Sequence, residues 1–211
     1  SYPICWRCKS EIVFRLVPAW YIKTSEIKPK LIECANSVKW EPASNGKRMN
    51  DWLTNMGDWN ISRKRYYGMP LPFYPCDCGH ITVIGSKAEL REKAVDPAQV
   101  DALPELHRPW VDAVKIKCPH CGKEVSRVSD IGDVWLDAGI VPFSTLGYFT
   151  DREAWEKNFP AEWVTEMHEQ VRLWFYSMLF MSTVLVGRAP YEKVVTNGMV
   201  VSEDGSKFSK T

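Results

Sequence analysis

Four cysteines stand in two tight pairs, and each pair is followed by a glycine. They are Cys76, Cys78, Cys118 and Cys121, with 39 residues between the pairs. Thiolates in two close pairs suit tetrahedral zinc, and the glycines let the backbone turn so that amides face the sulfurs. The spacing predicts a structural zinc site, because four protein ligands leave no open position for chemistry. His80, His107 and His120 are substitute ligands, and four buried free thiols are the alternative without metal.

A third pair, Cys5 and Cys8, is half of the same kind of site. Its partners are absent, since Cys34 is single and the other four cysteines complete a set. Either the other half lies in sequence beyond these 211 residues, or the two thiols form a reducible pair without metal. The opening at Ser1 without Met indicates an excised fragment.

Three consecutive cations, Arg63, Lys64 and Arg65, lie among aromatic residues in segment 59–68. Cations interleaved with rings suit phosphate contacts and the stacking of bases, whereas a solvated basic loop is the plainer alternative. Residues 1–70 hold 12 basic and 6 acidic residues, and residues 71–211 hold 15 and 20. A polyanion should therefore meet the first third of the chain.

Polar side chains gather at two further points. Glu166, Glu169 and Gln170 open an expected helix after an expected strand, where acceptors can bind ribose hydroxyls or an ammonium; a favourable first helical turn is the alternative. Lys207 and Lys210 lie three apart in a Gly/Ser loop and can reach one anionic group such as a pyrophosphate, unless the loop is only a mobile surface segment.

The composition describes an ordinary globular protein with 45% hydrophobic and 25% charged residues, which excludes disordered and collagen-like classes. A net charge of +1 excludes a strongly basic nucleic-acid coat. The most apolar stretch, Val171–Val186, is 16 residues long and too short to span a bilayer. Without a signal peptide, the sequence predicts a cytoplasmic chain with no membrane partner.

Alternating strands and helices predict an α/β fold with a parallel sheet. Residues 11–22 favour one or two short strands, and residues 69–130 carry little core of their own. Helices are expected at 28–38, from Asn50 or Asp51 to Gly57, at 151–158 and from about 166 to 186. Further strands are expected at 133–137, 162–166 and 193–201.

The order of these motifs resembles that of class I aminoacyl-tRNA synthetases, and most closely their isoleucyl branch. The matching pieces are Tyr2–Cys8, Trp59–Gly68, Leu106–Pro109, Asp133–Gly139, Glu166–Phe175 and Lys207–Lys210. The resemblance implies an α/β chain that is the second half of a Rossmann-like catalytic domain with an inserted zinc-ribbon-like subdomain. In the family the last loop reads Lys-Met-Ser-Lys-Ser, whereas Phe208 and Thr211 replace Met and the final Ser here.

The resemblance also implies a division of the chain into four parts. Residues 1–24 would be a stem returning from a missing editing insertion, with half a zinc site. Residues 25–68 would be a helical connector with the cationic loop, residues 69–130 the zinc-ribbon-like subdomain, and residues 131–211 the catalytic half that ends at the lysine loop.

The implied reaction activates isoleucine with ATP and Mg²⁺ and transfers it to tRNA(Ile). The implied catalytic residues are Lys207, Ser209 and Lys210; Glu166, Glu169, Gln170, Gly198 and Lys210 would bind the adenylate; Trp135 and Trp174 would line the amino-acid pocket; Arg63, Lys64 and Arg65 would meet tRNA phosphates. The missing parts of the polypeptide would be partners, and the isolated chain should have little activity. A valyl or leucyl enzyme and a non-catalytic zinc-ribbon RNA-binding module are the alternatives.

Overall fold

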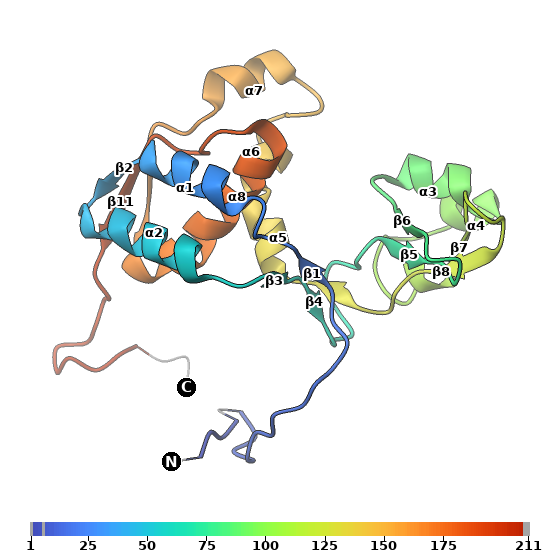
Figure 1. Ribbon diagram of the computed structural model, residues 1–211, viewed down its shortest axis with the longest axis horizontal. Helices are drawn as coiled ribbons and strands as arrows, with labels where there is room; N and C mark the ends of the chain where they lie inside the picture. The colour runs from blue at the N-terminus through green and yellow to red at the C-terminus, as the bar shows by residue number, and fades with distance from the viewer. Residues whose placement is uncertain (1, 6, 209–211) are drawn as a thin grey trace.

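The computed structural model describes residues 2–5 and 7–208 (Figure 1). Its strands are β1 Tyr21–Ile22, β2 Lys39–Glu41, β3 Trp59–Asn60, β4 Ser62–Arg63, β5 Phe73–Pro75, β6 Ile81–Val83, β7 Lys115–Lys117, β8 Glu124–Ser126, β9 Ile131–Gly132, β10 Val164–Met167 and β11 Lys193–Asn197. Its α-helices are α1 Lys28–Asn36, α2 Ser44–Asn55, α3 Lys87–Lys93, α4 Pro97–Asp101, α5 Val134–Gly139, α6 Val141–Ser144, α7 Arg152–Asn158 and α8 Trp174–Val186, with 3-10 turns η1 Val111–Ala113 and η2 His168–Arg172.

A parallel sheet in the order β10-β11-β2 forms the centre of the larger lobe. Sequence patterning predicts β10 and β11 and their parallel pairing, and the structure confirms both. Sequence patterning does not predict β2, in which Trp40 pairs with Val194 of β11. An ion pair at 3.0 Å between Lys193 Nζ and Glu41 Oε2 joins the same two strands.

Helices α1, α2 and α8 pack on this sheet around one hydrophobic core (Figure 1). The most deeply buried members are Leu31, Met49, Leu53, Val171, Phe175, Leu179 and Val194. Cys34 belongs to this core too, and its Sγ lies 3.7 Å from the carbonyl oxygen of Gly187. We call this part of the chain the sheet lobe. Residues 28–56 therefore share one hydrophobic core with α8 and β11.

Residues 69–130 form a second lobe, the cysteine lobe, which lies to the side of the sheet lobe (Figure 1). Two antiparallel hairpins, β5–β6 and β7–β8, carry the four paired cysteines at or beside their turns. The expectation of little core is wrong, because ten buried residues pack together here: Tyr74, Ile84, Leu90, Ala94, Val100, Val111, Val114, Ile116, Cys118 and Val125. Each short element contributes only one or two of them, so no window of sequence looks hydrophobic.

Two short strand pairs connect the lobes. β4 pairs antiparallel with β9, and β1 pairs antiparallel with β3. Residues 11–22 supply only β1 and an isolated bridge between Glu11 and Ile4, so most of the expected strand is an exposed extended segment. Its β-branched residues have no neighbouring strand among the described residues.

Residues 133–137, expected as a strand, form most of helix α5. Asp133 is the N-cap, and its carboxylate accepts a hydrogen bond from the Trp135 backbone N–H at 3.2 Å. The alternation of Val134 and Leu136 is typical of a strand, but the cap at Asp133 favours a helix.

The helix expected from Asn50 or Asp51 is α2, which begins at Ser44. The sequence of its first residues, which include Gly46, is typical of a turn. The helix needs glycine at position 46 because a Cβ there would lie 2.8 Å from Trp40 Cδ1. The helix expected from 166 to 186 is also interrupted: the backbone of Leu173 leaves the helical region and separates η2 from α8. No helix in the described part of the chain is long and apolar enough to cross a membrane.

Candidate functional site

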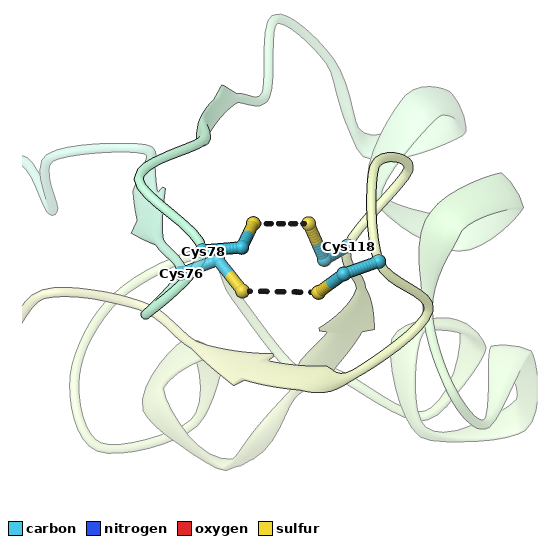
Figure 2. A group of neighbouring side chains, drawn as sticks. Cys76, Cys78 and Cys118 are labelled. Atoms are coloured by element: carbon cyan, nitrogen blue, oxygen red, sulfur yellow. Dashed lines mark hydrogen bonds between the residues drawn. The ribbon is translucent and has the colours of Figure 1, made fainter.

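The four paired cysteines meet at one point of the cysteine lobe (Figure 2). Their Sγ atoms all lie within 4.8 Å of one another, with Cys76 and Cys121 at 3.5 Å and Cys78 and Cys118 at 3.7 Å. A zinc–sulfur bond of about 2.3 Å requires tetrahedral sulfurs roughly 3.8 Å apart. The donor set therefore fits a tetrahedral zinc ion with four protein ligands.

The pKa values of two of these thiols move in opposite directions. Against a backbone hydrogen bond from Cys78, burial and hydrogen bonds from the other cysteines raise the pKa of Cys76 to about 12, whereas that of Cys118 is lowered. Burial opposes ionisation of Cys118, but hydrogen bonds from the backbone of Cys121 and His120 and from the side chains of Cys121 and Cys78 together lower the pKa of the thiol from 9.0 to about 7. Gly79 and Gly122 have φ of +87° and +75°, which lets each loop turn beneath the sulfurs. His80 and His120 stack on each other, with ring centroids 6.2 Å apart, and neither belongs to the cluster.

Cys5 and Cys8 lie far along the chain from this cluster, in the N-terminal stem. Cys8 Sγ lies 2.9 Å from Ser10 Oγ, and this contact, with a second from the Ser10 backbone, lowers the pKa of Cys8 to about 7. Among residues 2–5 and 7–208, no histidine, carboxylate or further cysteine joins the two thiols to complete a metal site.

An open cavity of about 420 Å³ lies at the carboxyl edge of β10 and β11. Glu166, Glu169, Gly198 and Lys207 line it, so the structure brings the end of β10 and the start of η2 together with the segment that follows β11. Glu166 and Glu169 are exposed, and the Glu166 carboxylate accepts the Met167 backbone N–H at 2.9 Å. Ser209 and Lys210 lie outside the described residues.

Gln170 and the two tryptophans lie beside this edge, where α5 meets α8. The Gln170 Oε1 atom accepts the backbone N–H of Trp174 at 3.1 Å, which satisfies a donor at the start of α8. The Trp174 indole N–H donates to the Ala138 carbonyl at 3.0 Å. Ala138 is part of α5, the helix that also carries Trp135. The Trp174 indole at the start of α8 is thereby tied to α5.

Comparison with known proteins agrees with this arrangement. A profile of the family described as tRNA synthetases class I (I, L, M and V) matches residues 7–211. The chain belongs to the class I tRNA synthetases. Two isoleucine–tRNA ligases, from Clostridium novyi and Methanoculleus marisnigri, are 41% and 44% identical to the whole chain. The chain spans about a fifth of the length of these relatives, 20% of each.

The class I synthetase fold is also found in a solved structure. The ternary complex of Agrobacterium radiobacter K84 LeuRS with tRNA and LeuAMS matches 74% of this chain and 21% of its own, with a TM-score of 0.51. At 24% identity this likeness concerns the fold alone. The parallel sheet predicted from the sequence is therefore part of a class I synthetase fold.

Two of the three consecutive cations of this synthetase chain are paired with buried carboxylates. Arg63 Nη2 lies 2.7 Å from Asp133, and Lys64 Nζ lies 2.8 Å from Asp130. The carboxylate side chains are 5% and 6% exposed. The sequence alone predicts neither ion pair, although Asp133 opens one of the family-matching pieces. An aspartate one residue before a helix, as Asp133 is, was the available signal.

Asp133 holds three elements together, and its loss should destabilise the junction of the lobes. Besides Arg63 and the Trp135 N–H, its carboxylate accepts the Trp59 indole N–H at 3.1 Å. We expect Asp133→Ala to lower the free energy of unfolding by about 2–3 kcal/mol, because a cap and buried charged hydrogen bonds are lost. Urea denaturation measures this value.

Asp133→Asn separates the two contributions, because asparagine can still cap α5 but carries no charge. Its cost should be smaller than that of alanine. Asp137→Ala, an exposed change in the same first turn, is the control. Equal stability of Asp133→Ala and Asp137→Ala would contradict this role.

Proposed function

We propose that this chain is part of the catalytic domain of an isoleucine–tRNA ligase, which activates isoleucine with ATP and transfers it to tRNA(Ile) in the cytoplasm. The observation that carries the proposal is the cavity at the carboxyl edge of β10 and β11, lined by Glu166, Glu169, Gly198 and Lys207. Carboxyl edges of parallel strands are where α/β proteins bind nucleotides. The names of the relatives supply the amino acid.

In this proposal the acidic side chains and the Lys207 ammonium meet opposite parts of one ligand. Glu166 and Glu169 accept hydrogen bonds from hydroxyl or ammonium groups of an aminoacyl-adenylate, and Gln170 and Gly198 border the same ligand. Lys207, with Ser209 and Lys210 after it, stabilises negative charge on the phosphates of ATP, which would enter with Mg²⁺. Trp135 and Trp174 form apolar walls for a branched side chain.

We also propose that the cysteine lobe is a zinc-ribbon-like insert whose metal is structural. The support is the tetrahedral fit of the four sulfurs, which come from the turns of two neighbouring hairpins. The metal would fix the two cysteine turns to each other. It would take no part in the reaction, because the proposed catalytic groups lie in the sheet lobe. In this proposal residues 1–24 form the stem that returns from an editing insertion, and residues 131–211 form the second half of the Rossmann-like catalytic domain.

A chimera tests the catalytic proposal. Residues 1–211 replace the matching fifth of the Clostridium novyi isoleucine–tRNA ligase, and ATP–pyrophosphate exchange is measured with isoleucine and with valine. We expect exchange that prefers isoleucine. Glu166→Ala should lower the isoleucine kcat/KM by about 10²-fold, since one oriented hydrogen-bonding group is lost from the site.

The matched control is Glu162→Ala, an exposed glutamate just before the same strand that lies outside the cavity. It should exchange like the unmodified chimera. A soluble chimera that prefers valine, or that exchanges with neither amino acid, would overturn the proposal. So would a Glu166→Ala chimera as active as the unmodified one.

A further inference from the structure

A second cavity, of about 160 Å³, lies within the cysteine lobe. It shares no lining residue with the cavity at the sheet edge, and we call it the lobe cavity. Its apolar walls come from the region of hairpin β5–β6, from α3 and from segment 106–111, and they are formed by Pro70, Pro72, Ile84, Leu90, Leu106 and Val111. An apolar cavity of about 150 Å³ holds one benzene ring, so the lobe cavity has the size for a ligand with a single ring.

The lobe cavity has one buried polar group without a partner. Tyr74 lines the cavity and is 2% exposed, and in the described part of the chain its hydroxyl takes part in no hydrogen bond. A hydroxyl that is removed from water without a hydrogen bond lowers stability, so a ligand that supplies the bond gains affinity. Burial also raises the pKa of Tyr74, which keeps the phenol protonated and able to donate at neutral pH.

The two charged residues that line the lobe cavity are both cations. Lys87 is exposed, and it forms no ion pair among residues 2–5 and 7–208. Arg127 is buried, and its guanidinium already donates to Asp112 and to two backbone carbonyls. None of the described carboxylate side chains lines this cavity. The ammonium of Lys87 therefore favours an anionic group at the exposed end of the cavity.

We propose that the lobe cavity binds a small aromatic acid that has one ring and a polar substituent opposite its carboxylate. The order of the contacts follows from burial, because Tyr74 is almost fully buried whereas Lys87 is exposed. The ring fills the apolar space, the substituent shares a hydrogen bond with the Tyr74 hydroxyl, and the carboxylate meets the Lys87 ammonium. This site goes beyond the proposed function, whose substrates bind at the edge of the sheet.

Occupation of the lobe cavity should stabilise the cysteine lobe, because a ligand that binds only the folded form shifts the equilibrium towards it. Tyr74, Leu90 and Val111 line the cavity and also belong to the core of this lobe. With 4-hydroxybenzoate present, amide hydrogen exchange should slow in residues 69–130 and stay unchanged in α8.

The test is a ligand-observed NMR titration of the 211-residue chain, in buffer that contains zinc, with 4-hydroxybenzoate, benzoate and phenol. We expect saturable binding of 4-hydroxybenzoate and weaker binding of the other two, because each lacks one polar contact. Tyr74→Phe should weaken the binding of 4-hydroxybenzoate about fivefold, the effect of one hydrogen bond, and leave benzoate unchanged. Lys87→Gln should weaken both acids about threefold and leave phenol unchanged.

Tyr191→Phe and Lys123→Gln are the matched controls. Tyr191 is also a buried tyrosine, but its hydroxyl donates to the Phe175 carbonyl at 2.9 Å in the sheet lobe. Lys123 is an exposed lysine of the cysteine lobe that lies outside the lobe cavity. Neither change should alter the affinity for 4-hydroxybenzoate. Tyr191→Phe should lower the melting temperature, whereas Tyr74→Phe should not, because it removes no hydrogen bond of the folded chain.

Absence of saturable binding of 4-hydroxybenzoate, or an affinity that either cavity variant leaves unchanged, would overturn the site. A lower melting temperature of Tyr74→Phe would overturn it too, since the hydroxyl would then be bonded within the folded chain. The titration needs neither ATP nor isoleucine. Its failure would leave the pyrophosphate exchange of the chimera standing, and a chimera that does not exchange would leave the titration standing.

Discussion

Cys118→Ser should abolish stoichiometric zinc binding and unfold the cysteine lobe while the sheet lobe stays folded. The lobe has two hairpins of three-residue strands and one small core, and structural zinc sites supply on the order of 10 kcal/mol of folding free energy. Metal analysis should fall from one zinc per chain to none. Amide hydrogen exchange should accelerate in residues 69–130 and remain slow in α8 and β11.

Cys8→Ser is the control for this experiment, because it removes a thiol of the other pair. Its zinc content should equal that of the unmodified chain. Acidification should release the metal as protons compete for the thiolates. A chain that contains no zinc before mutation, or a Cys118→Ser variant with normal protection of residues 69–130, would contradict the structural role of the metal.

Gly139→Ala should separate helices α5 and α8 and disturb the proposed amino-acid pocket. A Cβ on Gly139 would lie 2.7 Å from the Ser177 carbonyl oxygen and 2.9 Å from its carbonyl carbon, both of them backbone atoms that cannot rotate away. Overpacking of this kind costs about 1–3 kcal/mol. Separation of the two helices would also move α5 relative to Trp174, which lines the proposed amino-acid pocket. KM for isoleucine in the chimera should therefore rise.

The matched control is Gly57→Ala, where a Cβ meets nothing within 4 Å. Thermal denaturation of the two variants gives the difference in stability directly. We expect Gly57→Ala to melt near the unmodified chain and Gly139→Ala to melt several degrees lower, which for about 200 residues corresponds to a few degrees per kcal/mol. Equal melting temperatures would show that the two helices can move apart at no cost.

Local signals predicted the features that depend on few residues. The cysteine pairs predicted a four-sulfur cluster, and the apolar runs around Val164 and Val194 predicted two parallel strands. Both follow from side-chain type at fixed spacing, which a single sequence displays directly. Glu166, which the sequence places at the start of a helix, lies in β10 instead, but it does mark the edge of the sheet where the cavity lies.

Features that arise from distant contacts escaped the same reasoning. β2 is a strand because Trp40 pairs with Val194, and nothing in residues 38–42 alone requires it. The three basic residues at 63–65 look equivalent in sequence, yet distant aspartates neutralise the first two and leave the third. Which charges remain available to a ligand therefore depends on tertiary structure.

The pairing of β2 with β11 bears on synthesis of the chain by the ribosome. The core of the cysteine lobe can close as soon as residue 130 has emerged, because its buried residues all lie between Tyr74 and Val125. β2 must wait for a partner about 150 residues downstream, and contacts so distant in sequence form slowly. Leu31, Met49 and Leu53 meanwhile lack the helix α8 that buries them. During translation the pair of helices α1 and α2 is the part of the nascent chain that most needs a chaperone.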